Sequence, residues 1–253
     1  MRFVFITGAA QGIGYATAQR FAKEGWFVGL FDINREQCVA HVASADFPNA
    51  VGGYCDVTSR ESVTAALAEF AEASGGRLDV LVNNAGVLSA GDFADMSLDQ
   101  LDAMADVNVK GLTTMSRLAF PLLKATRGAV MVNLCSASSI HGIPLLAVYS
   151  ATKFYVNGLT QALNIEWAEH DIHVTCIKPP PINTAMGHQL DPRHIAKMPV
   201  EMEPEAVAAA IWQAVHRKPL HIIMGTNTKL WYWINKLLPA GAAKRVVMAL
   251  TGA

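Results

Sequence analysis

The sequence predicts an α/β fold, in which a doubly wound sheet of seven parallel strands carries helices on both faces. Short apolar runs alternate with segments of helical period throughout residues 1–225. A glycine cluster directly follows the first apolar run, where a strand would lead into a helix. Hydrophobic residues make up 52% of the chain and charged residues 16%, which is typical of parallel strands buried on both faces.

The alternation assigns each element in order. Strands are expected at residues 2–7, 26–32, 51–55, 78–82, 129–135, 172–177 and 220–224. Helices are expected at residues 13–24, 35–45, 98–123, 149–170 and 204–216, and one more is expected to begin after the N-cap residues Thr58 and Ser59. The helix at 98–123 is expected to be interrupted near Lys110 and Gly111. Because a helix lies between successive strands, the connections are right-handed crossovers and the strands run parallel.

Two segments do not follow the alternation. Residues 179–203 contain five prolines and no clear period, and a loop of this length is expected to be functional, as a lid. Residues 228–253 form an amphipathic tail with bulky apolar residues, four basic residues and no acidic residue. No linker or repeat divides residues 1–227, which we interpret as one domain.

The glycine cluster, from Thr7 to Gly14, predicts a site for a dinucleotide. The spacing Gly-x3-Gly-x-Gly lets the backbone approach a phosphate closely, and the following helix offers free N–H groups and the positive end of its dipole. A tight strand-to-helix turn without a ligand is the alternative, which the position in the first βα unit disfavours. The residues expected to contact the cofactor here are Gly8, Gln11, Gly12, Ile13 and Gly14.

Asp32 closes the second strand and predicts the type of dinucleotide. A carboxylate at this position accepts hydrogen bonds from the adenosine ribose and repels a 2′-phosphate, so NAD is favoured over NADP. Arg35 is near in sequence and could bind a 2′-phosphate if Asp32 turned away, which keeps NADP open as the alternative. Further cofactor contacts are expected after the second, third and fourth strands, from Ile33, Asp56, Val57, Asn83, Ala85 and Gly86.

Tyr149 and Lys153 predict proton-transfer chemistry, because they are four residues apart on a predicted helix and share a face. A free tyrosine has a pKa of about 10, and lowering it to about 7 requires about 4 kcal/mol. An ammonium about 4 Å away, at an effective dielectric of about 20, supplies about that much. Ser136, thirteen residues upstream of Tyr149, can hold a substrate oxygen against the phenol. The set predicts hydride transfer between a nicotinamide, whose oxidised form adds positive charge, and a carbon bearing oxygen.

The chain contains a second Tyr-x3-Lys match, from Tyr232 to Lys236. Pro219 stands at the upstream position that Ser136 occupies for the first match. The second match also lies beyond the last predicted strand, so we interpret it as a coincidence of composition.

Together these motifs make the chain resemble the short-chain dehydrogenase/reductase family over residues 1–225. The resemblance implies a Rossmann-like sheet and assembly as a homodimer or homotetramer. It implies that Tyr149 is the general acid/base, that Lys153 lowers its pKa and holds the nicotinamide ribose, and that Ser136 orients the substrate oxygen. The motifs that carry it are Thr7-Gly8-x3-Gly12-x-Gly14, Asp56, Asn83-Asn84-Ala85-Gly86, Asn108, Ser136, Tyr149-x3-Lys153 and Pro179 through Thr184.

The resemblance implies further roles. Asn108 would hold a water that relays protons from Lys153 to solvent, and Tyr149 and Lys153 would contact the cofactor, as would Pro179, Ile182 and Thr184. The chain departs from the family where Pro180 replaces a usual glycine and Cys135 a common serine. Proline donates no N–H and has a fixed φ, so we expect the loop after the sixth strand to run differently.

The expected substrate is a lipophilic secondary alcohol or ketone, because the expected pocket residues are mostly apolar and include no obvious carboxylate clamp. They are Ser138, His141, Ile143, Pro144, Leu145, Leu146 and the lid from Met186 to Met198. His188, Arg193, His194 and Lys197 in the lid are interpreted as a solvated face. The alternatives are an NADPH-dependent carbonyl or 3-oxoacyl reductase and a non-catalytic NAD-binding sensor or scaffold. No metal is required, since Lys153 and the nicotinamide provide positive charge.

The composition of the chain limits which binding partners and which cellular compartment are expected. A formal net charge of −1 gives no electrostatic argument for a nucleic-acid partner. The four cysteines are scattered without zinc spacing and indicate reduced thiols in a cytoplasmic protein. A strand at residues 2–7 leaves no room for a signal peptide, and no apolar run is long enough to span a bilayer. Tryptophan with lysine in residues 228–253 predicts a weak peripheral membrane contact, with packing on the subunit or across an oligomer interface as the alternative.

Overall fold

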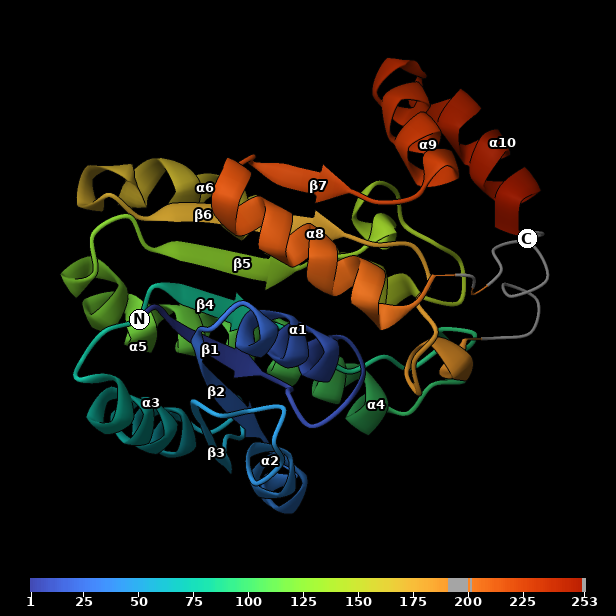
Figure 1. The fold of residues 1–253 in the computed structure, drawn as a ribbon. Helices are drawn as coiled ribbons and strands as arrows, with labels where there is room; N and C mark the ends of the chain where they lie inside the picture. The colour runs from blue at the N-terminus through green and yellow to red at the C-terminus, as the bar shows by residue number, and fades with distance from the viewer. Residues whose placement is uncertain (191–199, 201, 252–253) are drawn as a thin grey trace.

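A computed structural model describes residues 1–190, 200 and 202–251, and it confirms the predicted doubly wound sheet. The seven strands run parallel in the order β3-β2-β1-β4-β5-β6-β7 (Figure 1). The order changes direction between β1 and β4, which is where open sheets of this kind bind ligands. The strands are β1 (Phe3–Thr7), β2 (Phe27–Asp32), β3 (Ala50–Tyr54), β4 (Val80–Asn83), β5 (Val130–Leu134), β6 (His173–Lys178) and β7 (His221–Ile223).

Helices cover both faces because alternate strand residues point to opposite sides. Val4 and Ile6 of β1 pack with α1 (Gly12–Lys23) and α8 (Pro204–Arg217), in the same cluster as Cys38 of α2 (Arg35–Val42). Phe5, between them, packs against the opposite layer. That layer contains α3 (Arg60–Ser74), α5 (Leu112–Ala125) and α6 (Ala147–Glu166).

The helix predicted at 98–123 is divided into three parts. It begins as α4 (Leu98–Ala105), continues as a π-helical turn, η1 (Asp106–Gly111), and ends as α5. The predicted interruption near Lys110 and Gly111 therefore corresponds to a wider turn. Such turns are often found at functional sites, and this one carries Asn108, which is 1% exposed.

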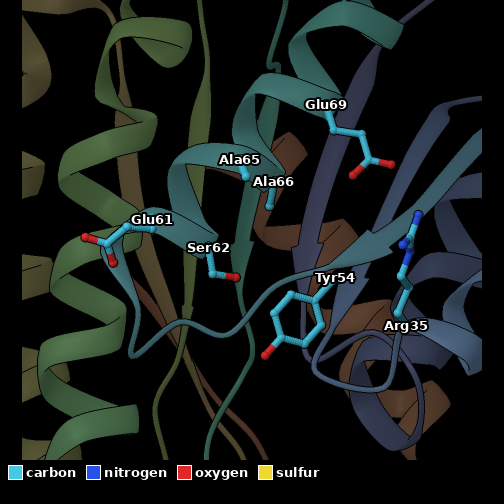
Figure 2. Close-up of a pocket in the computed structure, with 7 residues that line it drawn as sticks. All are labelled: Arg35, Tyr54, Glu61, Ser62, Ala65, Ala66 and Glu69. Carbon is cyan, nitrogen blue, oxygen red and sulfur yellow. The ribbon is translucent and has the colours of Figure 1, made fainter.

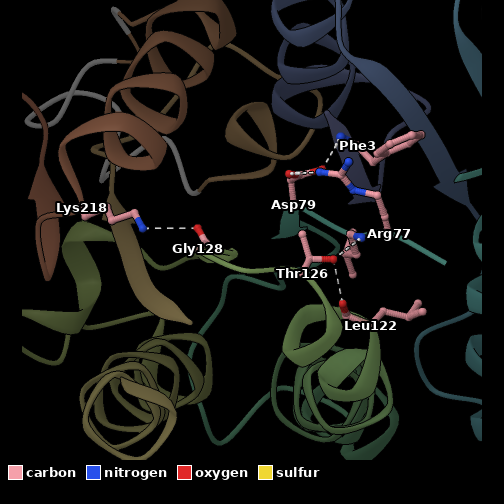
Figure 3. A network of polar contacts seen from close by, with 8 residues as sticks. Phe3, Arg77, Asp79, Leu122, Thr126, Gly128 and Lys218 are labelled. Atoms are coloured by element: carbon pink, nitrogen blue, oxygen red, sulfur yellow. Dashed lines mark hydrogen bonds and ion pairs between the residues drawn. The ribbon is translucent and has the colours of Figure 1, made fainter. Parts of the chain in front are cut away.

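A polar network fixes the amino ends of the strands (Figure 3). Asp79 accepts a hydrogen bond from the Phe3 N–H at 2.9 Å and pairs with Arg77. Thr126 accepts from the Leu78 N–H at 3.1 Å. These groups lie at the amino ends of the strands, so they hold the layers together at the end of the sheet that is opposite to the ligand-binding end.

Replacing Gly14 with alanine is expected to destabilise the fold. The added Cβ would lie against the backbone oxygen of Gly8 and 2.6 Å from Nδ2 of Asn84. Overpacking of this kind costs about 1–3 kcal/mol, a loss that denaturant unfolding would measure. The control is Gly158→Ala in α6, where nothing lies within 4 Å of the added Cβ and alanine should stabilise by about 0.5–1 kcal/mol. Equal stabilities for the two variants would contradict the packing argument.

The segment after the last strand is helical. It forms α9 (Thr226–Leu237) and α10 (Ala240–Thr251), which we call the C-terminal helix pair. The pair stands beyond the carboxyl end of β7, outside the two helical layers (Figure 1). Among residues 1–190, 200 and 202–251, no helix is long and apolar enough to cross a membrane.

Candidate active site

A cavity of about 1170 Å³ opens at the carboxyl ends of the strands. The glycine turn, the ends of β2 to β6, α6 and the C-terminal helix pair all contribute to its wall. It gathers most of the residues that the sequence assigned to a site. They are Gly8, Gln11, Gly12, Ile13, Asp32, Ile33, Asp56, Val57, Ala85, Gly86, Ser136, Ser138, Ile143, Leu146, Tyr149, Lys153, Pro179, Ile182, Thr184 and Met186.

The glycine turn has the geometry of an anion cradle. Gly8 and Gly12 have positive φ values of 66° and 56°, which non-glycine residues rarely adopt. Gln11 is the N-cap of α1, yet its side chain makes no capping hydrogen bond within the described chain, and the first turn of α1 contains no acidic residue. By contrast, Ser59 and Ser97 cap α3 and α4 through their side chains. The N-terminus of α1 therefore presents uncapped N–H groups and a positive dipole end near the cavity.

Asp32 lines the cavity beside the glycine turn. Its two carboxylate oxygens accept hydrogen bonds from the N–H groups of Ala10, at 3.1 Å, and Asn34, at 3.0 Å. These bonds fix the carboxylate between the glycine turn and the end of β2 while it still lines the cavity. Arg35 instead lines a separate pocket beside the edge strand β3, with Tyr54 and Glu69 (Figure 2). Of Asp32 and Arg35, it is therefore Asp32 that lines the main cavity.

Asn83 is not at the cofactor cavity, contrary to the sequence prediction. It is 4% exposed, and its Nδ2 donates to Ser116 at 3.1 Å and to Asn133 at 2.9 Å inside the sheet. The next residue, Asn84, lines the cavity, and its Nδ2 donates to the carbonyls of Thr7 and Gly8. Strand alternation decides between the two amides, because Asn83 is the last paired residue of β4 and points to the α5 layer.

Gly14 is likewise outside the lining of the cavity. It lies behind the turn, where α1 approaches the Gly8 carbonyl too closely for a side chain. Its contribution is the packing of α1 on β1 rather than a direct contact, so the predicted cofactor contact is replaced by a structural role.

Tyr149, Ser136 and Lys153 meet in the cavity. The Tyr149 side chain is 9% exposed and forms a hydrogen bond with Ser136. Ser136 accepts from the Ser138 hydroxyl at 2.9 Å, which fixes its Oγ. The Lys153 ammonium donates to the Leu134 carbonyl at 2.9 Å and lies 5.5 Å from the centre of the Tyr149 ring. A phenol, a hydroxyl and an ammonium therefore meet in one site.

The charges of the chain alone do not make Tyr149 a base at neutral pH, which corrects the sequence argument. Burial raises the pKa of Tyr149 to about 12, although the hydrogen bond with Ser136 opposes the rise. Burial also lowers the pKa of Lys153. The ammonium donates its hydrogen bond to the Leu134 carbonyl and lies 5.5 Å from the centre of the Tyr149 ring. The cost of removing a phenolate from water therefore outweighs the hydrogen bond that stabilises it.

Asn108 lies behind the catalytic groups rather than in the wall of the cavity. Its Oδ1 accepts from the Val87 N–H at 2.9 Å, and its Nδ2 donates to the Val87 carbonyl and to Thr152. A Cβ placed on Gly86 would lie 3.2 Å from Oδ1 of Asn108 and 3.8 Å from Nζ of Lys153. Asn108 and Lys153 thus both lie next to Gly86, where the absence of a side chain leaves space between them. The role of Asn108 in a proton relay stays a prediction.

The loop after β6 crosses the cavity toward the glycine turn. Pro179, Pro180 and Pro181 all line the cavity, and the Pro179 carbonyl accepts from the Ala137 N–H at 2.9 Å. A Cβ on Gly12 would lie 3.3 Å from the methyl group of Thr184. The loop therefore places Thr184 beside the glycine turn.

Three predicted pocket residues do not line the cavity. Leu145 adopts a φ of 61° and its carbonyl accepts from the Gly91 N–H, so Leu146 lines the cavity in its place. His141 is also outside the lining, with its Nδ1 2.9 Å from the Gly142 carbonyl and its ring 6.1 Å from that of Trp231. Pro144 does not line the cavity either. The lid residues Arg193, His194, Lys197 and Met198 lie outside the described residues.

Residues distant in sequence complete the wall. Trp231 of α9 and Val247 of α10 line the cavity, with Thr226, Asn227 and Thr228. No local motif could have identified them, since their position depends on how the C-terminal helix pair packs. Cys135, the departure expected to be a packing residue, also lines the cavity, and its Sγ donates to the Lys153 carbonyl at 3.2 Å.

Comparison with known proteins shows the family. The short chain dehydrogenase family model matches residues 2–194. The chain belongs to the short-chain dehydrogenase family. It is 34% identical to an uncharacterized oxidoreductase of Staphylococcus aureus over 86% of this chain and 91% of that protein. It is 32% identical to an NAD-dependent glycerol dehydrogenase of Listeria innocua over 72% and 71%.

A solved structure supports the same assignment. The NADH complex of a 3-ketoacyl-(acyl-carrier-protein) reductase from Brucella melitensis superposes with a TM-score of 0.78 at 27% identity, over 88% of this chain and 96% of that chain. As a short-chain dehydrogenase, the protein is an oxidoreductase that acts on CH–OH groups, and its family binds NAD or NADP.

Proposed function

We propose that this short-chain dehydrogenase uses NAD to interconvert a lipophilic secondary alcohol and its ketone. The observation that carries the proposal is one cavity holding Tyr149, Ser136 and Lys153 together with Asp32. The catalytic group and the ribose-recognition group are separated along a wall that is otherwise largely apolar. This is the arrangement that hydride transfer to an extended dinucleotide requires.

The residues present fit a dinucleotide. The positive-φ turn at Gly8 and Gly12 and the uncapped N-terminus of α1 would hold the pyrophosphate. Asp32 would accept the ribose hydroxyls, Asp56 would meet the adenine, and Lys153 would bind the second ribose. When bound, the oxidised nicotinamide accepts the hydride and brings a positive charge to the site.

Tyr149 holds the transferable proton at its Oη. Because burial raises its pKa to about 12 in the chain alone, the neutral phenol is ready to protonate a ketone oxygen. In the oxidative direction the same oxygen receives the hydroxyl proton of the alcohol, and the phenolate form then needs the positive charges of the loaded site. Ser136 orients the substrate oxygen, and Asn108 would hold the water that passes protons outward past Lys153.

The lining favours a lipophilic substrate. Leu88, Ile143, Leu146 and Leu190 line the cavity and pack in one cluster with Tyr149, and Trp231 also lines the cavity. Among the described residues of the wall, the basic side chain is that of Lys153, whose Nζ binds the Leu134 carbonyl. Little remains to pair with a substrate carboxylate, and apolar surface is what the wall can bury.

We also infer a homodimer or homotetramer. Phe154 and Tyr155 of α6 are 42% and 39% exposed, although large aromatic residues are usually covered. The Tyr155 hydroxyl lies 2.8 Å from Thr113 of α5. The two helices therefore present one continuous surface for a partner subunit.

The proposal is tested by measuring reduction of NAD and of NADP in parallel, over secondary alcohols of increasing chain length and ring size. We expect turnover with NAD whose kcat/KM rises with apolar size, by up to about fivefold per added methylene. Turnover with NADP alone would overturn the cofactor, and preference for small charged hydroxy acids would overturn the substrate class. NAD binding without turnover of any alcohol or ketone would favour a sensor instead.

A further inference from the structure

The C-terminal helix pair has two chemically different faces. Its inner face holds the pair on the protein and walls the cavity, because Trp231 and Val247 both line that space. Asn235 donates to the Ile140 carbonyl at 3.0 Å, and the Lys178 ammonium lies 5.6 Å from the centre of the Tyr232 ring. These contacts fix which side of α9 points away from the protein.

The outer face of α9 carries an exposed apolar stripe. The stripe consists of Leu230, Trp233, Ile234 and Leu237, which follow the i, i+3, i+4, i+7 spacing of one helix face. Their exposed fractions are 59%, 62%, 36% and 84%, so all four side chains meet solvent. Met248 of α10 is also exposed. A contiguous stripe of this size marks an interaction surface rather than scattered surface residues.

The charge around the stripe is of one sign. Lys229 and Lys236 flank it on α9, and Lys244 and Arg245 are exposed on α10. From residue 206 to the end the sequence contains no aspartate or glutamate, although the whole chain has a net charge of −1. The Lys236 ammonium lies 5.3 Å from the centre of the Trp233 ring, so cation and apolar surface are adjacent. The matching partner is apolar at its centre and anionic at its rim.

We propose that the C-terminal helix pair docks this protein on an anionic lipid bilayer. The stripe enters the boundary between headgroups and acyl chains, and the four basic residues lie among the headgroups. A second copy of the chain is the weaker fit. Two such faces would bring basic residues against basic residues without an acidic partner in the pair.

Docking would also bring the cavity to the source of its substrate. Since α9 and α10 place Trp231 and Val247 in the wall and the stripe on the opposite side, the helix pair would lie between the cavity and the lipid. This part of the inference rests on the proposed function. A lipophilic alcohol or ketone would then enter from the bilayer, where it is concentrated.

The docking test uses the full chain and vesicle co-sedimentation, without NAD or substrate. Vesicles of phosphatidylcholine alone are compared with an equal mixture of phosphatidylcholine and phosphatidylserine. We expect binding to the mixed vesicles, and a loss of at least about tenfold in the double variant Trp233→Ser/Leu237→Ser. Leu98→Ser, in a residue of α4 that is 75% exposed, is the matched control and should bind like the unmodified protein.

A charge variant tests the second half of the interaction. Lys229→Gln/Lys244→Gln/Arg245→Gln should weaken binding to mixed vesicles by about fivefold for each residue and reduce its salt dependence. Lys23→Gln/Arg60→Gln/Arg127→Gln removes three basic residues elsewhere and should not.

Several results would overturn the proposal. These are no binding to mixed vesicles, binding that the stripe variant retains, or a stripe variant that instead loses a subunit contact in analytical ultracentrifugation. Binding to an acidic protein but not to vesicles would equally assign the surface to another partner.

Delivery of substrate is measured separately. Turnover of an alcohol dissolved in mixed vesicles is compared with turnover of a water-soluble alcohol. The stripe variant should lose rate only with the vesicle-dissolved alcohol, because its cavity residues are unchanged. Equal loss with both alcohols would overturn delivery. Absence of all turnover, with vesicle binding intact, would reject the proposed function and leave the docking surface standing.

Discussion

Tyr149→Phe is expected to lower kcat by about 10²- to 10⁴-fold, the range over which a positioned acid or base contributes to a rate. The variant removes one oxygen, at the position where the cavity brings a phenol against Ser136. Affinity for NAD should change by less than about tenfold, since at most one hydrogen bond to the cofactor is lost. Steady-state kinetics with NAD binding measured by fluorescence separates the two quantities.

Tyr232→Phe is the matched control. Tyr232 begins the second Tyr-x3-Lys match, and its ring lies 4.5 Å from the Lys236 ammonium, but it is outside the wall of the cavity. Its loss should change kcat by no more than about twofold, as for a residue remote from the reaction. Near-normal activity in Tyr149→Phe, or equal losses in both variants, would contradict the assignment of the acid/base.

Titration of the same variant tests the electrostatics. With a pKa raised to about 12 by burial, Tyr149 should remain neutral where a free tyrosine, of pKa about 10, ionises. The stabilisation that the neutral phenol provides is then fully present below pH about 10 and lost as the pH rises through about 12. The tyrosinate absorbance of the protein minus that of Tyr149→Phe should show this late step, with circular dichroism followed in parallel. A step below pH about 10 would show that Lys153 alone lowers the pKa.

Asp32→Ser is expected to lower kcat/KM for NAD by about 10- to 150-fold, the value of one or two hydrogen bonds to a charged group. Use of NADP should not fall to the same extent, because the variant also removes the charge that repels a 2′-phosphate. Asp32 also anchors the glycine turn through the Ala10 N–H. Damage to the turn would lower both activities together, so the ratio of the two kcat/KM values reports ribose recognition.

Arg35→Gln serves as the control for this prediction. Arg35 lines the pocket beside β3 rather than the cofactor cavity (Figure 2). The ratio of NAD to NADP use should therefore stay within about twofold of that of the unmodified protein. A ratio that follows Arg35 and ignores Asp32 would show that the arginine turns into the site and that NADP is the natural cofactor.

Sequence reasoning predicted the sheet and the positions of most site residues because those features are local. The glycine turn requires positive φ at Gly8 and Gly12, and only glycine allows it cheaply. Tyr149 and Lys153 share a face because of helix geometry alone. Asp32 is the last residue of its strand and therefore reaches the carboxyl edge of the sheet wherever that strand lies.

The mistaken residues depend on finer geometry. Asn83 and Asn84 are adjacent amides, and strand alternation placed the second at the cavity. Leu145 and Leu146 are adjacent leucines, and a left-handed residue at 145 decided which one lines it. In both places the sequence predicted the right type of side chain at the cavity. The backbone conformation decides which of the two adjacent residues points into it.

The sequence by itself determined the fold, the family and the order of the catalytic motifs, because each rests on a few consecutive residues. Tertiary structure alone decided that Trp231 and Val247 wall the cavity. It also decided that the pKa of Tyr149 is raised in the chain alone, because burial is a sum over segments far apart in the sequence. The same packing left the stripe on α9 exposed. The spacing of apolar residues predicts that the helix has such a stripe, but only the folded structure shows whether the rest of the protein covers it.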